Sequence, residues 1–256
     1  MTISRRKVLL GGFAAALLAA CSNARTARAG APASSSTSTP PTTSPRLAPT
    51  VAPVVPAGPA RFIRSGPSRK TVALTFHGSG DLGLTQRLLD GAKRAGAPIT
   101  VFAVGQWLEA NPQMATAIQS GGHELANHTY THPPLKQVGR ADLVREITKC
   151  RDVLKRETGS AGRWFRPSGT DTPTQAMLDE AGAAGYPVVV GYDIDPLDYQ
   201  DPGAPAVLQR VKAALHPGAI VSLHTGHPGT VDAFEPIVTA LRAAGLEPVL
   251  LRDHLA

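Results

Sequence analysis

The chain has 256 residues, of which 42% are hydrophobic, and its formal net charge is +7. This length and composition fit one large globular domain. The whole excess of positive charge lies in the first 61 residues, because residues 62 to 256 carry 19 basic and 19 acidic side chains. The folded part is therefore neutral overall, so the high isoelectric point gives no support for a nucleic-acid-binding protein.

The first 21 residues are typical of an export signal. A basic segment, Arg5-Arg6-Lys7, precedes an apolar run from Val8 to Ala20 that is too short to span a bilayer. The basic segment resembles a bacterial twin-arginine signal, and Leu18-Ala19-Ala20-Cys21 resembles a lipobox, after which the cysteine is lipidated. We expect an exported lipoprotein on the outer face of the cell membrane, or a secreted protein. The alternative is an ordinary secretory peptide with a chance cysteine.

Residues 22 to 62 are expected to form a tether. Up to about Ala60 this stretch consists mainly of serine, threonine, proline, alanine and arginine, with no acidic residue and almost no large apolar one. Such a composition cannot build a hydrophobic core. We therefore expect one folded domain at residues 63 to 256.

Short apolar runs alternate with segments of helical periodicity throughout this domain. Strands are expected at residues 71–77, 98–104, 122–127, 163–166, 187–194, 219–224 and 247–251. Helices are expected at residues 84–95, 106–119, 141–158, 174–185, 205–215 and 231–244. The alternation demands a parallel sheet, and a full eight-unit barrel takes about 250 residues. The prediction is an α/β fold, a distorted seven-stranded (β/α) barrel.

Polar side chains recur at the carboxyl ends of the expected strands. They are His77, His128, Arg166, Asp195 with Asp198, and His224. In parallel β/α folds this edge of the sheet is where ligands bind and chemistry occurs. We therefore expect these side chains to lie around one site.

His128 and His132 are spaced to bind one metal ion. Imidazole is the commonest neutral ligand of zinc, and two rings four residues apart at the end of a strand can face the same way. The motif alone is weak evidence. The position of this pair among the other strand-end residues favours a site for a divalent metal, for which we expect zinc. The metal then needs a third ligand.

A glycine motif suggests a different function. Gly78-Ser79-Gly80-Asp81-Leu82-Gly83 matches G-x-G-x-x-G and lies between an expected strand and an expected helix, as in dinucleotide-binding proteins. The next strand, residues 98–104, is not followed by an acidic residue that could bind a ribose. We therefore expect no nucleotide cofactor and attribute the glycines to a tight turn beside the site.

Taken together, residues 70 to 256 resemble the NodB-homology polysaccharide deacetylases, the fourth carbohydrate esterase family. His128-Thr129-Tyr130-Thr131-His132 matches the metal-binding H-[ST]-x-x-H motif of that family. Phe165-Arg166-Pro167 resembles its arginine motif, and Asp195-Pro196-Leu197-Asp198-Tyr199 resembles D-x-x-D-W. Leu223-His224 resembles the motif that closes the site.

Two motifs depart from the family pattern. Where the family has T-F-D-D-G-P, with one aspartate as base and the next as metal ligand, this chain has Thr75-Phe76-His77-Gly78-Ser79-Gly80-Asp81. We expect Asp81 to replace the ligand and His77 to replace the base; the reverse assignment, with His77 as ligand and Asp81 as base beside Arg166, stays open. The arginine motif also lacks its aromatic residue, since Ser168-Gly169 follows Pro167.

The resemblance implies hydrolysis of N-acetyl groups in a peptidoglycan-like polysaccharide. His224 would be the general acid, Asp195 would orient its imidazole, and Arg166 would pair with Asp81 or Asp171. Two alternatives remain. One is a catalytically degenerate glycan-binding protein on the same fold, and the other is a hydrolase of another non-peptide C–N bond.

Overall fold

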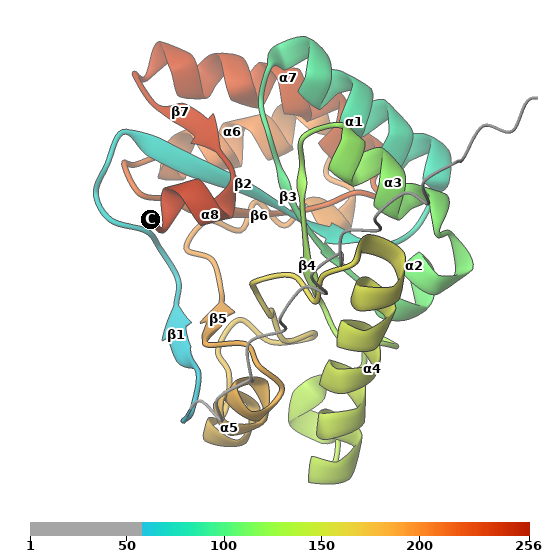
Figure 1. The fold of residues 1–256 in the computed structure, drawn as a ribbon. Coiled ribbons are helices and arrows are strands. Elements are labelled where there is room, and N and C mark those ends of the chain that lie inside the picture. Colours follow the sequence, from blue (N-terminus) through green and yellow to red (C-terminus); the bar gives the residue numbers. More distant parts are fainter. Residues whose placement is uncertain (1–57) are drawn as a thin grey trace, which may run out of the picture. The chain divides into compact units, whose positions relative to one another are not determined.

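The computed structural model describes residues 58 to 256. The expected export signal, Cys21 and nearly all of the expected tether lie outside the described residues. Figure 1 shows the elements. The strands are β1 (Arg61–Ile63), β2 (Thr71–Gly78), β3 (Thr100–Ala103), β4 (Glu124–Asn127), β5 (Val188–Val190), β6 (Ile220–His224) and β7 (Glu247–Val249). The α-helices are α1 (Leu82–Ala95), α2 (Gly105–Ala110), α3 (Gln113–Ser120), α4 (Arg140–Thr158), α5 (Gln175–Ala183), α6 (Ala204–Ala214), α7 (Pro228–Ala243) and α8 (Leu251–His254). Two short 3₁₀ helices, η1 (Leu135–Gln137) and η2 (Asp198–Gln200), complete the set.

The strands form a parallel α/β sheet, as the sequence predicts. Their order is β4-β3-β2-β6, with β7 beside the start of β2, while β1 pairs with β5. Single bridges at Asn127–Phe165, Phe165–Val189 and Ile194–Val221 connect the two groups of strands. Together the two groups of strands form a distorted ring, in which isolated bridges replace a continuous ladder on the side of β5.

Several predicted elements differ from those observed. The strand expected at residues 163–166 is reduced to the bridges of Phe165. The helix expected at residues 106–119 breaks into α2 and α3 at Pro112, because proline has no amide hydrogen and disfavours helical geometry in the residue before it. The last strand stops at Val249 and α8 follows. Strand β1 begins in the last two residues of the stretch expected to be tether, and Ala60 just before it is buried.

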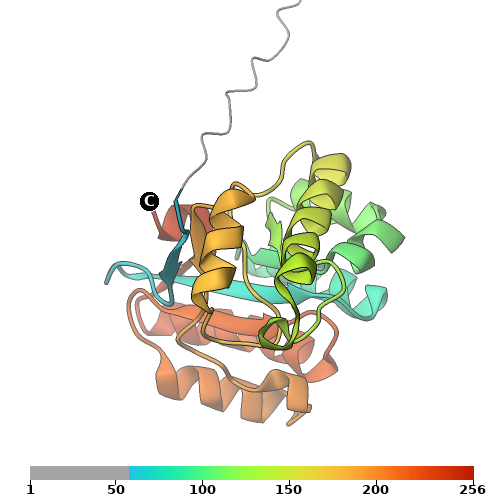
Figure 2. The same cartoon turned by 90° about the horizontal axis from the view of Figure 1, so that it is seen from below.

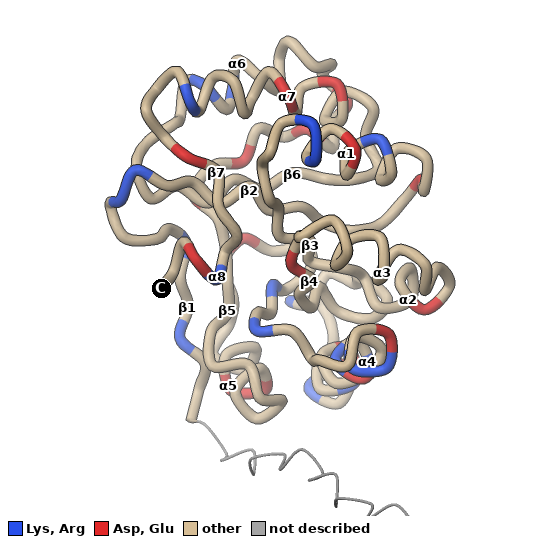
Figure 3. The backbone as a smooth tube through the Cα atoms, turned by 45° about the horizontal axis from the view of Figure 1, so that its top comes forward, with Lys and Arg blue, Asp and Glu red and all other residues tan. Residues whose placement is uncertain are grey.

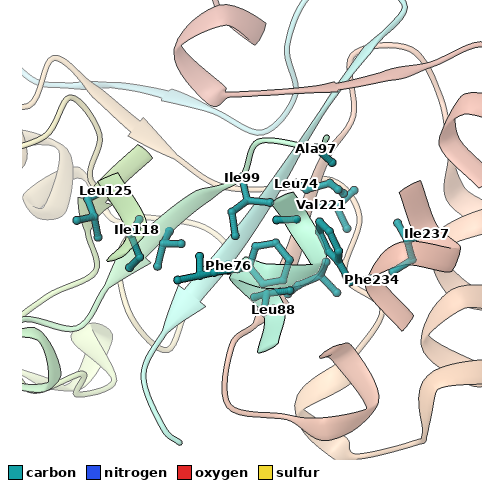
Figure 4. Close-up of a cluster of buried hydrophobic side chains, with 14 of the residues drawn as sticks. Leu74, Phe76, Leu88, Ala97, Ile99, Ile118, Leu125, Val221, Phe234 and Ile237 are labelled. Atoms are coloured by element: carbon teal, nitrogen blue, oxygen red, sulfur yellow. The ribbon is translucent and has the colours of Figure 1, made fainter. Parts of the chain in front are cut away.

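Alternation along β2 separates the hydrophobic core from the inside of the ring. Val72, Leu74 and Phe76 pack among helices α1 and α7 in the largest core cluster, part of which Figure 4 shows. Ala73, Thr75 and His77 point the opposite way, since successive side chains of a strand alternate between its faces. Each large apolar side chain buried outside the ring contributes about 1.5–3 kcal/mol to stability. The inner face of β2 can therefore hold polar residues, Thr75 and His77, toward its carboxyl end.

Helices pack around the strands in Figure 2, with α6 and α7 on one side and α4 and α5 on another. Figure 3 shows acidic and basic residues interspersed over these elements, which agrees with the neutral charge of the domain. Within residues 58 to 256 no helix is both long and apolar enough to cross a membrane.

Candidate metal centre

The carboxyl ends of the strands bring the predicted polar residues together. His77 and His224 are direct neighbours in the register of β2 and β6, and His128 follows the last residue of β4. A cavity of about 470 Å³ opens at this edge. Its walls are His77, His132, Pro167, Gly169, Thr170, Asp171, Tyr192, Asp195, Tyr199 and His224. The cavity is therefore the candidate functional site.

Three histidines form the centre of this site. One ring nitrogen from each of His77, His128 and His132 lies within 4.8 Å of the other two, and the Nε2 atoms of His128 and His132 are 3.1 Å apart. Two nitrogen ligands of one tetrahedral zinc ion, each about 2.0–2.1 Å from the metal, lie at a similar separation. The donor set therefore fits a divalent ion that accepts nitrogen ligands.

Loss of hydration favours the neutral form of these imidazoles, although His132 is more exposed than the other two. Loss of hydration lowers the pKa of His77 and of His128 well below the ordinary value, and the neighbouring histidines and Arg166 lower the pKa further. Burial also lowers the pKa of His132, with a smaller contribution from His224. Neutral imidazole has a free lone pair, which is the form that binds a metal.

Neighbouring groups fix which nitrogen of two rings is available. The Nδ1–H of His128 donates to the carbonyl oxygen of Arg166 (2.9 Å), so its Nε2 lone pair faces His132. Nε2 of His77 lies 3.0 Å from the hydroxyl of Ser222, which leaves Nδ1 for a metal when Nε2–H is the donor. Such outer contacts orient metal-binding histidines in proteins generally.

Asp81 is not part of this cluster, and the expectation that it supplies the third ligand is corrected. It is the N-cap of α1: its Oδ1 accepts the amide hydrogen of Leu84 (2.8 Å), and the residue is exposed. Capping aspartates satisfy one of the free amides at the start of a helix. The structure thus supports the reverse assignment only in its first half, with His77 in the ligand position.

This role of Asp81 gives a stability prediction. Asp81→Ala is expected to lower the free energy of unfolding by about 1 kcal/mol, because one helix-capping hydrogen bond is lost. Chemical denaturation followed by circular dichroism measures the change. If the folded Asp81→Ala variant lost its metal, Asp81 would be a metal ligand and not only a helix cap.

The structure also explains why no carboxylate stands at position 78. A Cβ atom added to Gly78 would lie 2.6 Å from Cγ1 of Val101 and 3.2 Å from Cα of Ala103. By the alternation of β2, that side chain would point to the helix side with Phe76 and away from His77. A side chain at position 78 would therefore meet Val101 and Ala103, whereas His77 lies on the inner face near His128 and His132.

Arg166 is buried beneath the site without a carboxylate partner. Its guanidinium donates to the carbonyl oxygens of Val190 and Gly191 and to the hydroxyl of Thr75, and it lies 4.0 Å from the centre of the Phe102 ring. Burial lowers the pKa of Arg166 to about 9. The expected pairing is corrected, because Asp81 caps α1 and the nearest ion-pair contact of Asp171 is with Arg64, at 3.9 Å. Arg166 instead contacts the end of β5, through Val190 and Gly191, and Thr75 within β2.

His224 is oriented by Asp198, not by Asp195 as the sequence analysis expects. The Nδ1–H of His224 donates to Oδ1 of Asp198, and its backbone amide donates to Oδ2, both at 2.8 Å. The hydroxyl of Thr230 also donates to Asp198, which is almost completely buried. Leu197 has a φ of 54°, and this turn brings the second aspartate of the motif toward His224.

Asp195 has a different position. Its Oδ1 accepts the amide hydrogen of Leu197 (2.9 Å), and its side chain lines the cavity. Desolvation raises its pKa, and the charge of Asp198 adds to this rise. Asp195 therefore faces the substrate space and does not hold the imidazole of His224.

Two tyrosines complete the cavity. Tyr192 and Tyr199 line it, and Tyr199 is 45% exposed, with its ring edge-on to His224 at 5.4 Å between centroids. Trp107 and Trp164 are used elsewhere: their indole N–H groups donate to Gly80 and Glu124. The exposed aromatic surface at the site thus comes from the tyrosines.

Sequence reasoning missed two polar residues that touch this site. Ser222 contacts His77 and Thr75 contacts Arg166. Each lies two residues before a predicted site histidine, and so faces the same side of its strand. Strand alternation is the signal that could have identified both.

Comparison with known proteins identifies relatives of this chain. The family model described as polysaccharide deacetylase matches residues 64–189. A peptidoglycan-N-acetylglucosamine deacetylase of Bacillus cereus is 31% identical over 192 residues, covering 73% of this chain and 69% of that protein. A chitooligosaccharide deacetylase of Sinorhizobium fredii is 31% identical over 165 residues, covering 64% and 76%.

Solved structures agree. A peptidoglycan N-acetylglucosamine deacetylase superposes with a TM-score of 0.71 at 30% identity, covering 76% of this chain and 92% of that one. A pseudoenzyme of the fourth carbohydrate esterase family from Bacillus anthracis superposes with a TM-score of 0.73 at 26% identity, covering 78% and 70%. A mutant of that pseudoenzyme is described as having restored enzymatic activity.

The parallel α/β ring with histidines at its carboxyl edge is the architecture of a carbohydrate-esterase domain. The chain belongs to the polysaccharide deacetylase family, with a divergent first motif.

Proposed function

We propose that this protein is an exported, metal-dependent hydrolase that removes N-acetyl groups from a cell-wall or related polysaccharide. The observation that carries the proposal is the convergence of His77, His128 and His132 at a cavity that His224 also lines. Ligands and a proton donor thereby face one space large enough for a sugar. The deacetylases among the relatives support the substrate class.

The metal would be held by three neutral nitrogen donors. Such a set suits zinc better than magnesium or calcium, which prefer oxygen ligands. When bound, the ion would polarise the acetyl carbonyl and lower the pKa of a water molecule toward about 7. Because no carboxylate ligand offsets the charge of the ion, both effects should be strong in this site.

His224 has the position and the partner of a general acid. Amide hydrolysis requires a proton on the departing nitrogen as its bond to the acetyl carbon breaks. The Nδ1–H of His224 is engaged in the hydrogen bond to Asp198, so Nε2 is the nitrogen that would deliver this proton. The two hydrogen bonds to Asp198 hold the ring of His224 in place for this transfer.

The sugar would lie against the tyrosine side of the cavity. Tyr199 offers an exposed ring next to His224, and Tyr192 also lines the cavity, near His77. Aromatic faces pack well on the apolar faces of sugar rings. Asp195 and Asp171 also line the cavity and can accept hydrogen bonds from sugar hydroxyls.

Acetate release together with metal content tests this proposal. The purified full-length protein should contain about one zinc ion per chain, in keeping with a single cluster of ligands. It should release acetate from peptidoglycan or chitooligosaccharides, and a chelator should abolish the release. Bound zinc without acetate release from any N-acetylated glycan would reject the enzymatic function.

A second function is favoured by the altered first motif. Both carboxylates of that motif are missing, Arg166 has no carboxylate partner, and a relative of similar fold is a pseudoenzyme. These observations favour a glycan-binding protein without turnover. Retained binding to an insoluble wall polymer, measured by sedimentation with no acetate released, would establish this alternative.

The expected lipid anchor gives a separate prediction on location. If Cys21 is lipidated, Cys21→Ser should move the protein from the membrane fraction to the soluble exported fraction. Immunoblotting of fractionated cells measures the shift. A Cys21→Ser protein that still sediments with membranes would show that the anchor lies elsewhere.

A further inference from the structure

A buried glutamate lies directly behind the metal-binding loop. Glu146 is on α4, is only 6% exposed, and points toward the segment between His128 and His132. Its Oε2 accepts the backbone amides of Tyr130 (2.8 Å) and Thr131 (2.7 Å), and its Oε1 accepts the hydroxyl of Thr131 (2.7 Å). One carboxylate thus binds three donors from two consecutive loop residues.

The loop needs such support because its backbone is unusual. Thr129 has a φ of 67° and His132 has a φ of 62°, a left-handed conformation that costs free energy for residues other than glycine. This conformation brings Nε2 of His132 to 3.1 Å from Nε2 of His128. A loop that relaxed to ordinary φ values would separate the two nitrogens.

Other contacts hold Thr129 and the carbonyl oxygen of Tyr130. The side-chain oxygen of Asn127 accepts the amide hydrogen of Thr129 (2.9 Å). The amides of Gly105 and Gln106, at the start of α2, donate to the carbonyl oxygens of Thr129 and Tyr130. The amide of Thr131, next to the second ligand, is bound by Glu146.

We propose that Glu146 is a positioning residue of the metal centre, which holds the loop in the conformation where His128 and His132 bind one ion. The carboxylate acts through the backbone of residues 130 and 131 and does not touch the ion. Its negative charge, in a site whose ligands are all neutral, also favours a bound cation. This inference rests on the metal binding put forward in the proposed function.

Zinc affinity of the folded protein is the measurement that decides. Glu146→Gln keeps the size of the side chain but leaves one acceptor oxygen for three donors. Its dissociation constant for zinc, measured by competition with a chromophoric chelator, should rise about 10- to 100-fold, the usual effect of losing an outer contact of a metal site.

The chain contains a matched control. Glu124 is also 6% exposed and also accepts three hydrogen bonds, from Trp164, Thr100 and the amide of Arg252. It is the first residue of β4, whereas the ligand His128 follows the last residue of that strand. Glu124→Gln should lower the melting temperature and leave the zinc affinity unchanged. A merely structural role for Glu146 would give the same pattern in both variants.

Wild-type zinc affinity in folded Glu146→Gln overturns the inference. If that variant does not fold, Thr131→Val, which removes one of the three donors, takes its place: weaker zinc binding supports the inference and unchanged binding overturns it. A wild-type protein that binds no zinc would instead reject the proposed function. The two failures are therefore distinguishable.

Discussion

Replacing His77 with alanine is expected to remove metal and acetate release together. His77 is one of three residues whose ligand nitrogens lie within 4.8 Å of one another, and two remaining imidazoles leave the ion without its third protein ligand. The loss of zinc affinity should exceed the roughly 100-fold effect of losing an outer contact. Metal analysis after dialysis and an acetate assay measure both quantities on the same sample.

Asp81→Ala is the matched control for this experiment. Asp81 lies four residues beyond His77 and is the other candidate from the divergent motif, but its carboxylate caps α1. The Asp81→Ala variant should keep both zinc and activity under conditions where it is fully folded. If His77→Ala keeps zinc and loses only turnover, His77 is a base, and the ligand assignment is wrong.

Strand periodicity made most of the fold and the convergence of the site predictable. Alternating apolar runs and helical segments define a parallel sheet, and in such a sheet His77 and His224 must lie at one edge. The structure goes further and pairs them directly in the register of β2 and β6, which this rule does not specify. The irregular parts were not predictable in the same way, since Phe165 contributes only bridges and β1 crosses the boundary expected between tether and domain.

The choice between neighbouring acidic residues could not be made from the sequence. Asp195 and Asp198 both follow β5, and only the left-handed turn at Leu197 decides that Asp198 reaches His224. The position of Asp81 in the sequence suggested a metal ligand, but its carboxylate caps the start of α1. Glu146 contacts the loop through tertiary packing alone, and no motif signals it. Backbone turns and helix packing thus determine what spacing leaves open.

The second large effect is expected at the acid dyad. His224→Ala should lower kcat by about 10²- to 10⁴-fold, the usual contribution of a general acid, because nothing else in the site holds a proton for the leaving nitrogen in the same way. Zinc content should not change, since His224 is not among the three converging ligands. Loss of zinc in this variant would make His224 a ligand and leave the acid to be found elsewhere.

Asp198→Asn against Asp195→Asn separates the two aspartates. Asp198 fixes the Nδ1–H of His224 and is buried with three donors around it, so its amide variant should lose most of the turnover that depends on His224. Asp195 lines the cavity, and Asp195→Asn should act mainly on KM. Steady-state kinetics on a soluble chitooligosaccharide measures both parameters. A larger loss of kcat in Asp195→Asn than in Asp198→Asn would show that the observed His224–Asp198 pair is not the one that works in turnover.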